Sequence, residues 1–351
     1  MSNFIKVPFC KPFVNDFEVS EVKNTILNGW LTTGKISMEV ERMIAEYTGA
    51  KHCVLLTSAT AALHLSLEYI KRFVIKKDLK VYVPSLTFVS TASEVIHAGG
   101  KVIFGDVDDT LCLNPASKKD FNAVIPVHLT GVKAYTDYVC PVIEDSAHLI
   151  EKDQCKDNPN FVCYSFYATK NLTMGEGGAI CVNNQEAADW FRKASHHGIS
   201  KDGWKRYESL NNWQYEIEFV GWKYNPSDVL AAILKQQFGK LEIIQKERQR
   251  CVDIYNLYLG NSNKGLHLYP VLVSDRSKFI RAMADEGIQC SVHFLPLHKM
   301  KAFENCKKDD LHKTEYYGKY LVSLPLFPSL TNNEIETICT IAKKTGLLIN
   351  P

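Results

Sequence analysis

The sequence has no excess of one charge, no cysteine pair at metal-binding spacing and no long apolar run. Lysine and arginine total 41 against 39 aspartate and glutamate residues, so charge gives no support to a nucleic-acid-binding surface. None of the 11 cysteines forms a C-x-x-C pair, which argues against a zinc site or a dithiol redox centre. Most cysteines stand in apolar runs and are predicted to be buried free thiols in a reducing compartment.

No apolar stretch reaches the length of a membrane span, and residues 1–13 lack the apolar core of a signal peptide. These absences lead us to expect a cytoplasmic protein that binds neither membrane nor metal. The 351 residues are 46% hydrophobic, which is enough to bury a large core.

Short apolar runs alternate with longer amphipathic stretches through the first two thirds of the chain. The runs are rich in Val and Ile and predict strands near 53–57, 80–83, 101–104, 123–128, 141–144, 161–166 and 178–183. Alternation of strands with helical patterns predicts an α/β fold, here with a seven-stranded, mostly parallel mixed sheet. The last two runs are too close in sequence for a crossover helix, so we expect them to be antiparallel.

A long helical stretch near 226–258 precedes a change of pattern. Its leucines and isoleucines recur at the spacing of one helix face. After Asn261 the chain reads as short strands and helices, and it ends in an amphipathic segment near 333–345. We therefore predict a large domain over 1–240 and a smaller C-terminal α/β domain over 241–351.

Lys170 follows a predicted strand and precedes the glycine-rich turn Gly175-Glu-Gly-Gly178. A nucleophilic lysine must be neutral for part of the time, and burial lowers its pKa in that direction. A single lysine is far more often a solvated surface charge. Its role therefore depends on which groups the fold brings near it.

Asp145 stands at the end of the run 141–144, where open α/β sheets position groups that contact ligands. A carboxylate there can pair with a protonated pyridine nitrogen and make the ring a better electron sink. The alternative is that Asp145 caps a helix. His148, three residues later, could equally be a core histidine with one hydrogen bond.

Small and hydroxylated residues at 57–62 lie between a predicted strand and a helix. Free N–H groups and the helix dipole make such a place an anion site, although an ordinary Ser/Thr cap would look the same. Thr60 and Ser165 could add hydroxyl donors. Phe88 follows another strand and could stack on a flat ring or simply be a core residue. Together these pieces predict a phosphate cradle, a ring stack, a pyridinium partner and a Schiff-base lysine, the requirements of pyridoxal 5′-phosphate.

With these motifs in place, the sequence resembles the DegT/DnrJ/StrS family of sugar-nucleotide aminotransferases, which have the fold type I pyridoxal-phosphate architecture. The resemblance runs through nearly the whole chain. Its motifs are Trp30-Leu-Thr-Thr-Gly34, Tyr47-Thr-Gly49, Ser58-Ala-Thr60-Ala-Ala-Leu63, Val83-Pro-Ser-Leu-Thr-Phe88, Pro126-Val-His128, Glu144-Asp145, Ser165-Phe-Tyr-Ala-Thr-Lys170-Asn-Leu, Gly175-Glu-Gly-Gly178, His197-Gly198, Gly221-Trp-Lys-Tyr-Asn225, Ala231-Ala232, Ser291-Val-His293 and Leu324-Pro-Leu326.

The resemblance implies that Lys170 is catalytic, forming the Schiff base and moving the proton. It assigns cofactor binding to Ala59, Thr60, Phe88, Asp145, His148, Ser165, Lys170 and Asn225. Asn225 would reach the cofactor phosphate of the partner subunit, so a homodimer with the active site at the interface is implied. Sugar-nucleotide contacts would come from Thr32, Thr33, Lys223 and His293.

Two features depart from the family pattern. Ala59 stands where the family usually has glycine in the phosphate segment, and the stretch between His148 and Phe161 is shorter than usual. Neither affects Lys170, and dehydratases of the family have histidine in its place, so its presence favours transamination.

The EDSAH and GWKYN segments look most like family members that act at C4. The implied reaction moves the amino group of L-glutamate to a UDP- or dTDP-linked 4-keto-6-deoxyhexose, giving a 4-amino-4,6-dideoxy sugar such as viosamine. Three alternatives stay open: a C3-aminotransferase acting on a 3-keto sugar nucleotide, a pyridoxal-phosphate sugar dehydratase, and a non-catalytic regulator that binds the cofactor.

Overall fold

The computed structural model of the protein describes residues 6–115, 120–200 and 215–349. All seven predicted runs contribute to a large sheet. Its strands are β1 (His52–Leu56), β2 (Lys80–Pro84), β3 (Lys101–Gly105), β4 (Ala123–Val124), β5 (Ile143–Ser146), β6 (Phe161–Ser165) and β7 (Gly178–Val182).

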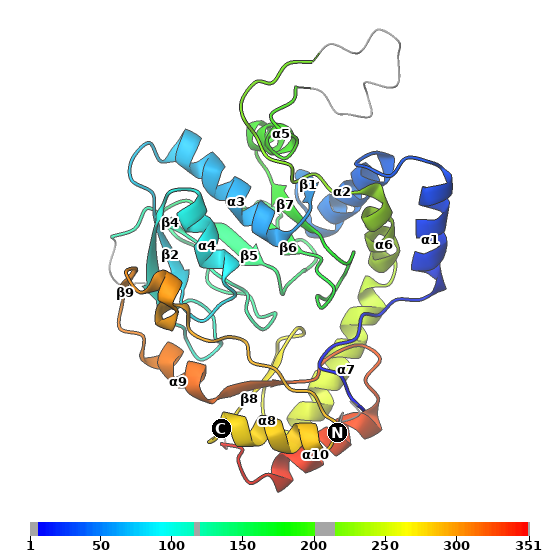
Figure 1. The fold of residues 1–351 in the computed structure, drawn as a ribbon, viewed down its shortest axis with the longest axis vertical. Helices are drawn as coiled ribbons and strands as arrows, with labels where there is room; N and C mark the ends of the chain where they lie inside the picture. Colours follow the sequence, from blue (N-terminus) through cyan, green and yellow to red (C-terminus); the bar gives the residue numbers. More distant parts are fainter. Residues whose placement is uncertain (1–5, 116–119, 201–214, 350–351) are drawn as a thin grey trace.

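Hydrogen bonds group the strands as β4-β2-β3 and β1-β7-β6-β5. Isolated bridges from Val124 to Val142 and from Val127 to Asp145 join the two groups, so the strand order is β3-β2-β4-β5-β6-β7-β1 (Figure 1). β7 is antiparallel to both of its neighbours, whereas β2, β3, β4 and the β5–β6 pair are parallel. The expected mixed, mostly parallel sheet is confirmed.

Two details of the sheet differ from the sequence prediction. The run at 123–128 forms a strand of only two residues, because Pro126 has no N–H to continue the ladder. A short strand from the C-terminal third, β9 (Lys307–Lys308), pairs in parallel with β3. Two consecutive exposed lysines carry no strand pattern, so this addition could not be expected.

Helices lie on both faces of the sheet (Figure 1). They are α1 (Asp16–Leu27), α2 (Lys35–Thr48), α3 (Ala59–Tyr69) with a π-turn at Ile70–Val74, α4 (Ser90–His97), α5 (Gln185–Ala194), α6 (Asp228–Phe238) and α7 (Leu241–Leu259). Consecutive residues of β1 enter different cores: Val54 and Leu56 pack with α3, and Leu55 packs with α2 and α6. Covering on both faces explains why the runs are continuously apolar.

The prediction of one continuous helix over 226–258 is wrong. The chain turns at Gly239 and Lys240, which separate α6 from α7. α6 packs against α1 and α2, and α7 then leaves the sheet toward the C-terminal third. The apolar periodicity continues through the turn, which is why the sequence pattern did not reveal it.

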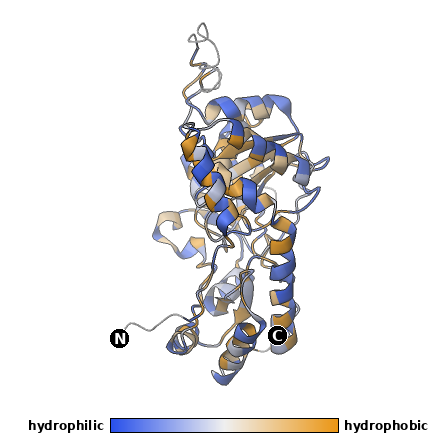
Figure 2. Ribbon diagram, turned by 90° about the vertical axis from the view of Figure 1, so that its right-hand side faces the viewer, coloured by the Kyte–Doolittle hydropathy of each residue, from blue (hydrophilic) through white to orange (hydrophobic). Residues whose placement is uncertain are grey.

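The C-terminal third forms a smaller layer around the antiparallel pair β8 (Tyr269–Leu272) and β10 (Leu321–Leu324). It also contains α8 (Arg276–Asp285), α9 (His312–Tyr320), α10 (Asn332–Lys344) and short 3-10 turns at Leu297–Lys299 and Lys301–Phe303. Its core includes Tyr269, Phe279 and Ile338 together with Val7 from the N-terminus. In Figure 2 the helices alternate between hydrophilic and hydrophobic colours along their length, as expected for amphipathic helices.

α7 passes between the two layers. Leu241 and Ile244 belong to the core beneath the large sheet, and Val252 and Tyr255 belong to the C-terminal core. The proposed boundary after residue 240 stays a prediction. Among the described residues, no helix has the length and apolarity needed to cross a membrane.

Candidate active site

A cavity of about 600 Å³ lies at the carboxyl ends of β5 and β6, between the large sheet and the C-terminal third. The parallel strands end at this edge, the expected place for a ligand site. Eight of the predicted site residues line it: Ala59, Thr60, Phe88, Asp145, His148, Ser165, Lys170 and His293. Residues up to 234 positions apart in the chain thus meet in one place.

Asp145 is buried, with 4% of its surface exposed. Its carboxylate accepts hydrogen bonds from the Thr91 hydroxyl at 2.8 Å and from the Ala147 N–H at 3.2 Å. Burial raises the pKa of Asp145, and these bonds only partly offset it. The carboxylate is therefore held rigidly in the cavity wall, with capacity for a cationic partner.

Lys170 lies in the same wall, just after β6. Burial lowers the pKa of Lys170 to about 8, against the opposing attraction of the Asp145 carboxylate. More of the amine is then neutral at neutral pH than for a solvated lysine, although the ammonium form still predominates. The neutral amine is the state that a nucleophilic lysine requires.

His148 lies deep in the cavity and donates from Nδ1 to the carbonyl of Leu129. Its ring packs against His267, with centroids 4.1 Å apart. Burial lowers the pKa of both rings well below the usual histidine value, and the positive charge of Lys170 acts in the same direction. Both imidazoles are thus neutral at neutral pH. With Nδ1 protonated, Nε2 of His148 is a hydrogen-bond acceptor.

The first turn of α3 opens onto the cavity. The Ser58 side chain caps the helix by accepting from the Ala61 N–H at 3.0 Å. The N–H groups of Ala59 and Thr60 have no partner inside a helix, since the first turn has no preceding carbonyls. Gly178 of β7 packs so closely here that a Cβ would lie 2.3 Å from the Ser58 carbonyl carbon. This explains the glycine that ends the predicted turn.

Phe88 and Ser165 complete the predicted cofactor contacts that the cavity contains. Phe88 is 54% exposed and lies 5.8 Å from the Phe294 ring, so it forms a wall rather than part of a core. Ser165 ends β6 and remains half-buried. His293 donates to or accepts from the Ser323 hydroxyl at 3.0 Å, and burial lowers its pKa to about 4.

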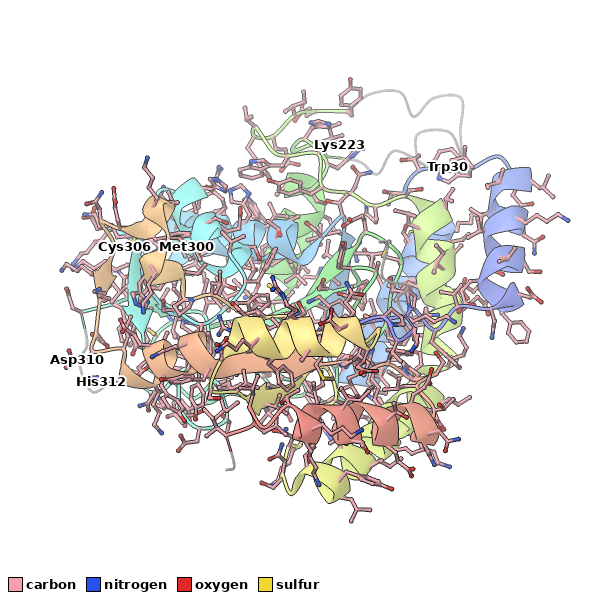
Figure 3. All side chains as sticks on the ribbon, turned by 60° about the horizontal axis from the view of Figure 1, so that its bottom comes forward. Trp30, Lys223, Met300, Cys306, Asp310 and His312 are labelled. Atoms are coloured by element: carbon pink, nitrogen blue, oxygen red, sulfur yellow. The ribbon has the colours of Figure 1, made fainter. Side chains whose placement is uncertain are left out.

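Four predicted residues lie outside this cavity. Thr32, Thr33 and Asn225 line a separate pocket of about 90 Å³. Within it, the Asn225 amide donates to the Thr33 hydroxyl at 2.8 Å. Lys223 donates to the side-chain amide oxygen of Asn225 at 2.5 Å and lies near the upper edge of Figure 3, as does Trp30. These residues form their own cluster in this chain.

The sequence pattern that defines the DegT/DnrJ/EryC1/StrS aminotransferase family matches residues 13–343. The chain belongs to this family. An uncharacterised protein of Methanocaldococcus jannaschii is 34% identical over 378 residues, covering 96% of this chain and 97% of its own. The spore coat polysaccharide biosynthesis protein SpsC of Bacillus subtilis is 33% identical over 372 residues, covering 95% of each.

Solved structures agree with this assignment. Spr1654 of Streptococcus pneumoniae, a candidate sugar aminotransferase, has a TM-score of 0.82 in its PMP form, at 26% identity over 97% of this chain and all of its own. PseC of Helicobacter pylori, an aminotransferase of pseudoaminic acid biosynthesis, has a TM-score of 0.86 over 97% of this chain and 98% of its own. At 19% identity, PseC shows the fold alone. The predicted fold, enzyme class and cofactor, pyridoxal phosphate, are confirmed.

The residues of this aminotransferase fit that cofactor. One cavity combines an open helix N-terminus for a phosphate, a buried carboxylate for a ring cation and a lysine with a lowered pKa. These three groups come from α3, β5 and the turn after β6.

Sequence reasoning missed several residues of this aminotransferase cavity. Thr87 lines the cavity, and its hydroxyl lies 2.9 Å from that of Thr91, which supports Asp145 from outside the cavity. His267 pairs with Asn171 at 3.1 Å, next to Lys170. Cys10 comes from the N-terminal segment and bonds the Thr169 carbonyl. Thr87 lay in a quoted motif and Thr91 follows Thr87 by four residues, whereas a lone histidine or cysteine in an apolar stretch gives no signal.

Proposed function

We propose that this aminotransferase moves the amino group of L-glutamate to a UDP- or dTDP-linked 4-keto-6-deoxyhexose, giving a 4-amino-4,6-dideoxy sugar such as viosamine. The observation that carries the proposal is that Lys170 and Asp145 line one cavity, together with the open end of α3. Pyridoxal phosphate supplies a carbonyl group that carries the amine and a ring that accepts electrons.

The side chains of the chain have distinct tasks in this proposal. Lys170 would hold the cofactor through Nζ and would take and return the substrate proton. Asp145 would accept a hydrogen bond from the protonated ring nitrogen. The N–H groups of Ala59 and Thr60, with the Ser165 hydroxyl, bind the phosphate. Phe88 and His148 enclose the ring and exclude water.

The active site is proposed to be completed by a second copy of the chain. Asn225 and Thr33 line a pocket separate from the cavity of Lys170 and Asp145, so within one chain they would not contact a cofactor bound there. A homodimer that places this cluster at the cavity of its partner would bring Asn225 to the phosphate. Thr32, Lys223 and His293 would then contact the sugar nucleotide. A cytoplasmic location stays a prediction.

A sugar substrate is supported by SpsC, whose name assigns it to polysaccharide biosynthesis. The choice of C4 rests on the EDSAH and GWKYN segments. Amination at C3 of a 3-keto sugar nucleotide is the alternative acceptor, and dehydration on the same scaffold is the alternative reaction.

The test is to incubate the purified enzyme, pyridoxal phosphate and L-glutamate with a panel of 3-keto and 4-keto sugar nucleotides. We expect 2-oxoglutarate to accumulate with the 4-keto compounds and product NMR to place nitrogen on C4. Nitrogen on C3 would move the assignment to the alternative acceptor. Turnover of the sugar without 2-oxoglutarate would identify a dehydratase.

A further inference from the structure

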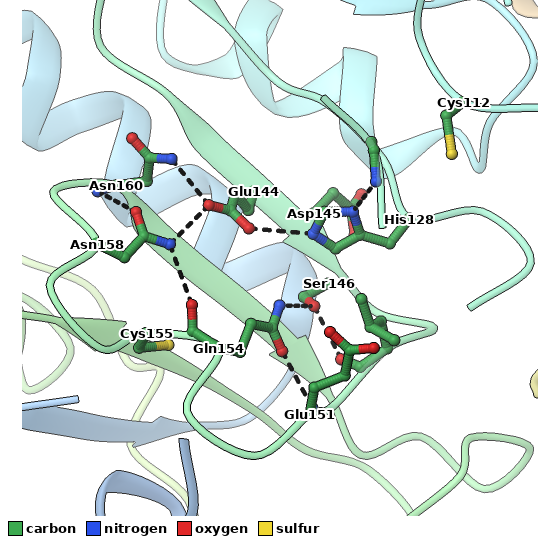
Figure 4. Close-up of polar contacts among 12 residues, drawn as sticks. Cys112, His128, Glu144, Asp145, Ser146, Glu151, Gln154, Cys155, Asn158 and Asn160 are labelled. Carbon is green, nitrogen blue, oxygen red and sulfur yellow. Dashed lines mark hydrogen bonds and ion pairs between the residues drawn. The ribbon is translucent and has the colours of Figure 1, made fainter. Parts of the chain in front are cut away.

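A polar network with a buried centre and a partly exposed margin surrounds Glu144 on β5 (Figure 4). Its centre is Glu144, which precedes Asp145 on the strand and, because side chains alternate along a strand, points to the other face. Neither Glu144 nor His128 has any exposed surface. A buried carboxylate is costly unless hydrogen bonds complete it, so its partners are informative.

Both oxygens of Glu144 have partners. Oε2 lies 3.1 Å from Nε2 of His128, and Oε1 accepts from the Asn158 and Asn160 amides, each at 2.8 Å. The Ala134 N–H donates to Nδ1 of His128 at 3.0 Å. Nδ1 is thus an acceptor, so Nε2 carries the hydrogen and donates to Glu144.

These bonds reach both neighbours of β5. His128 belongs to the segment after β4, and Asn158 and Asn160 belong to the loop that leads into β6. The main chain completes the connection on one side: the His128 N–H donates to the Asp145 carbonyl at 3.1 Å, and the Asp145 N–H donates to the Pro126 carbonyl at 2.9 Å. His128 therefore hydrogen-bonds to β5 at two points: its backbone N–H bonds to Asp145 and its side chain bonds to Glu144.

This connection falls where the sheet has few ladder hydrogen bonds. β4 has only two residues, and isolated bridges alone join it to β5. Burial raises the pKa of Glu144, but the bonds from His128, Asn160 and Asn158 together lower it below the usual value. The carboxylate thus stays ionised and holds its three donors firmly.

We infer that Glu144 is a positioning residue: through His128 and the two asparagines it fixes β5, so that the Asp145 carboxylate meets the ring nitrogen of the cofactor. The inference rests on the proposed role of Asp145. A misplacement of about 1 Å in a supporting group is enough to weaken a site substantially.

The test compares binding of two probes to the apoenzyme by absorbance titration: pyridoxal 5′-phosphate, and its 1-deaza analogue, in which carbon replaces the ring nitrogen. Only the first can use Asp145. The ratio of the two dissociation constants therefore reports the Asp145 contact and cancels general damage to the cavity.

Glu144→Gln is expected to reduce this preference for pyridoxal phosphate by about tenfold, within the range seen when the supporting partner of a ligand-binding side chain is removed. His128→Gln, which can still donate to Glu144 and accept from Ala134, should retain most of the wild-type preference, whereas His128→Leu should not. The matched control is Glu18→Gln, since Glu18 is a buried carboxylate in α1 with bonds to Asn15 and Gln237. It should leave the preference within about twofold of wild type.

Asp145→Asn distinguishes a failure of the inference about Glu144 from a failure of the proposed role of Asp145. If it abolishes the preference and Glu144→Gln does not change it, the inference fails and the role of Asp145 stands. If Asp145→Asn leaves the preference intact, both fail. Should Glu144→Gln not fold, Asn160→Ala removes one donor at the half-exposed margin of the network, and an unchanged preference in that variant also overturns the inference.

Discussion

Glu144 and Asp145 are consecutive buried residues of one strand, and burial raises the pKa of both, yet the net pKa shifts have opposite signs. On Glu144, bonds from three side chains outweigh burial and leave its pKa lowered. On Asp145, two bonds are too few, and its pKa stays raised. A carboxylate with all its partners supplied by the protein stabilises the fold, whereas one left short of donors is prepared for a cationic ligand.

The largest effect is expected on the cavity face, from Lys170→Ala. Loss of the amine should remove the visible absorption band of the holoenzyme and lower the transamination rate by at least about 10²–10⁴-fold, the usual contribution of a positioned proton-transfer group. Absorbance spectra and single-turnover assays measure both. Lys240→Ala, which removes a lysine paired with Glu18 outside the cavity, is the control and should keep the band. An active, yellow Lys170→Ala enzyme would refute the assignment.

The second experiment compares the two carboxylates directly in the apoenzyme. Glu144→Gln should lower the free energy of unfolding by about 1–3 kcal/mol, because an NH₂ donor replaces one of the two acceptor oxygens and faces another donor. Asp145→Asn should leave stability within about 1 kcal/mol of wild type or raise it, since it removes a poorly compensated buried charge. Urea unfolding of both variants decides the matter. Equal losses of unfolding free energy would mean that Glu144 and Asp145 contribute alike to stability.

The third prediction concerns the pH at which apoenzyme binds its cofactor. The rate of pyridoxal phosphate incorporation should rise with pH and level off above about 8, the pKa of Lys170. Asp145→Asn should move this midpoint to lower pH, because the carboxylate is what raises the lysine pKa. Stopped-flow absorbance gives the midpoint. A plateau reached only near the ordinary lysine value of 10.5 would contradict a desolvated amine.

The smallest effect is the pH dependence of apoenzyme stability. The lowered pKa of Glu144 gives stability that is present above 4.5 and lost as the pH falls through its folded pKa, so Glu144→Gln should approach wild type in acid. The raised pKa of Asp145 gives the opposite sign: the stability of its protonated form is complete below 3.8 and lost as the pH rises through its folded pKa. The stability of Asp145→Asn should therefore increase relative to wild type as the pH rises. If unfolding free energy plotted against pH runs parallel to wild type for both variants, the two carboxyls do not have opposite pKa shifts.

The sequence predicted the cavity well where chemistry is tied to strand ends. Lys170, Asp145 and the start of α3 follow apolar runs, and parallel strands bring such ends to one edge of a sheet. It could not predict the wall that comes from distant segments. Cys10 and His267 reach the cavity only because the N-terminal segment and the C-terminal third pack there, and neither carries a local pattern.

The same limit applies to the elements. Strand positions followed from runs of Val and Ile, whereas the end of α6 did not, because apolar spacing continues through Gly239 and Lys240. The partners of Glu144 were also hidden. Asn158 and Asn160 stand in a polar loop that reads as solvent-exposed, and only the fold turns their amides toward a buried acid.

The passage of α7 through both cores has a consequence for dissecting the protein. A fragment that stops before Leu241 would lose Leu241 and Ile244 from beneath the large sheet. A complementary fragment that starts after the helix would lose Val252 and Tyr255 from the C-terminal core. Neither fragment keeps a complete hydrophobic core without α7. Expressed separately, the two fragments should expose apolar surface and aggregate, and the whole enzyme should unfold as one cooperative unit.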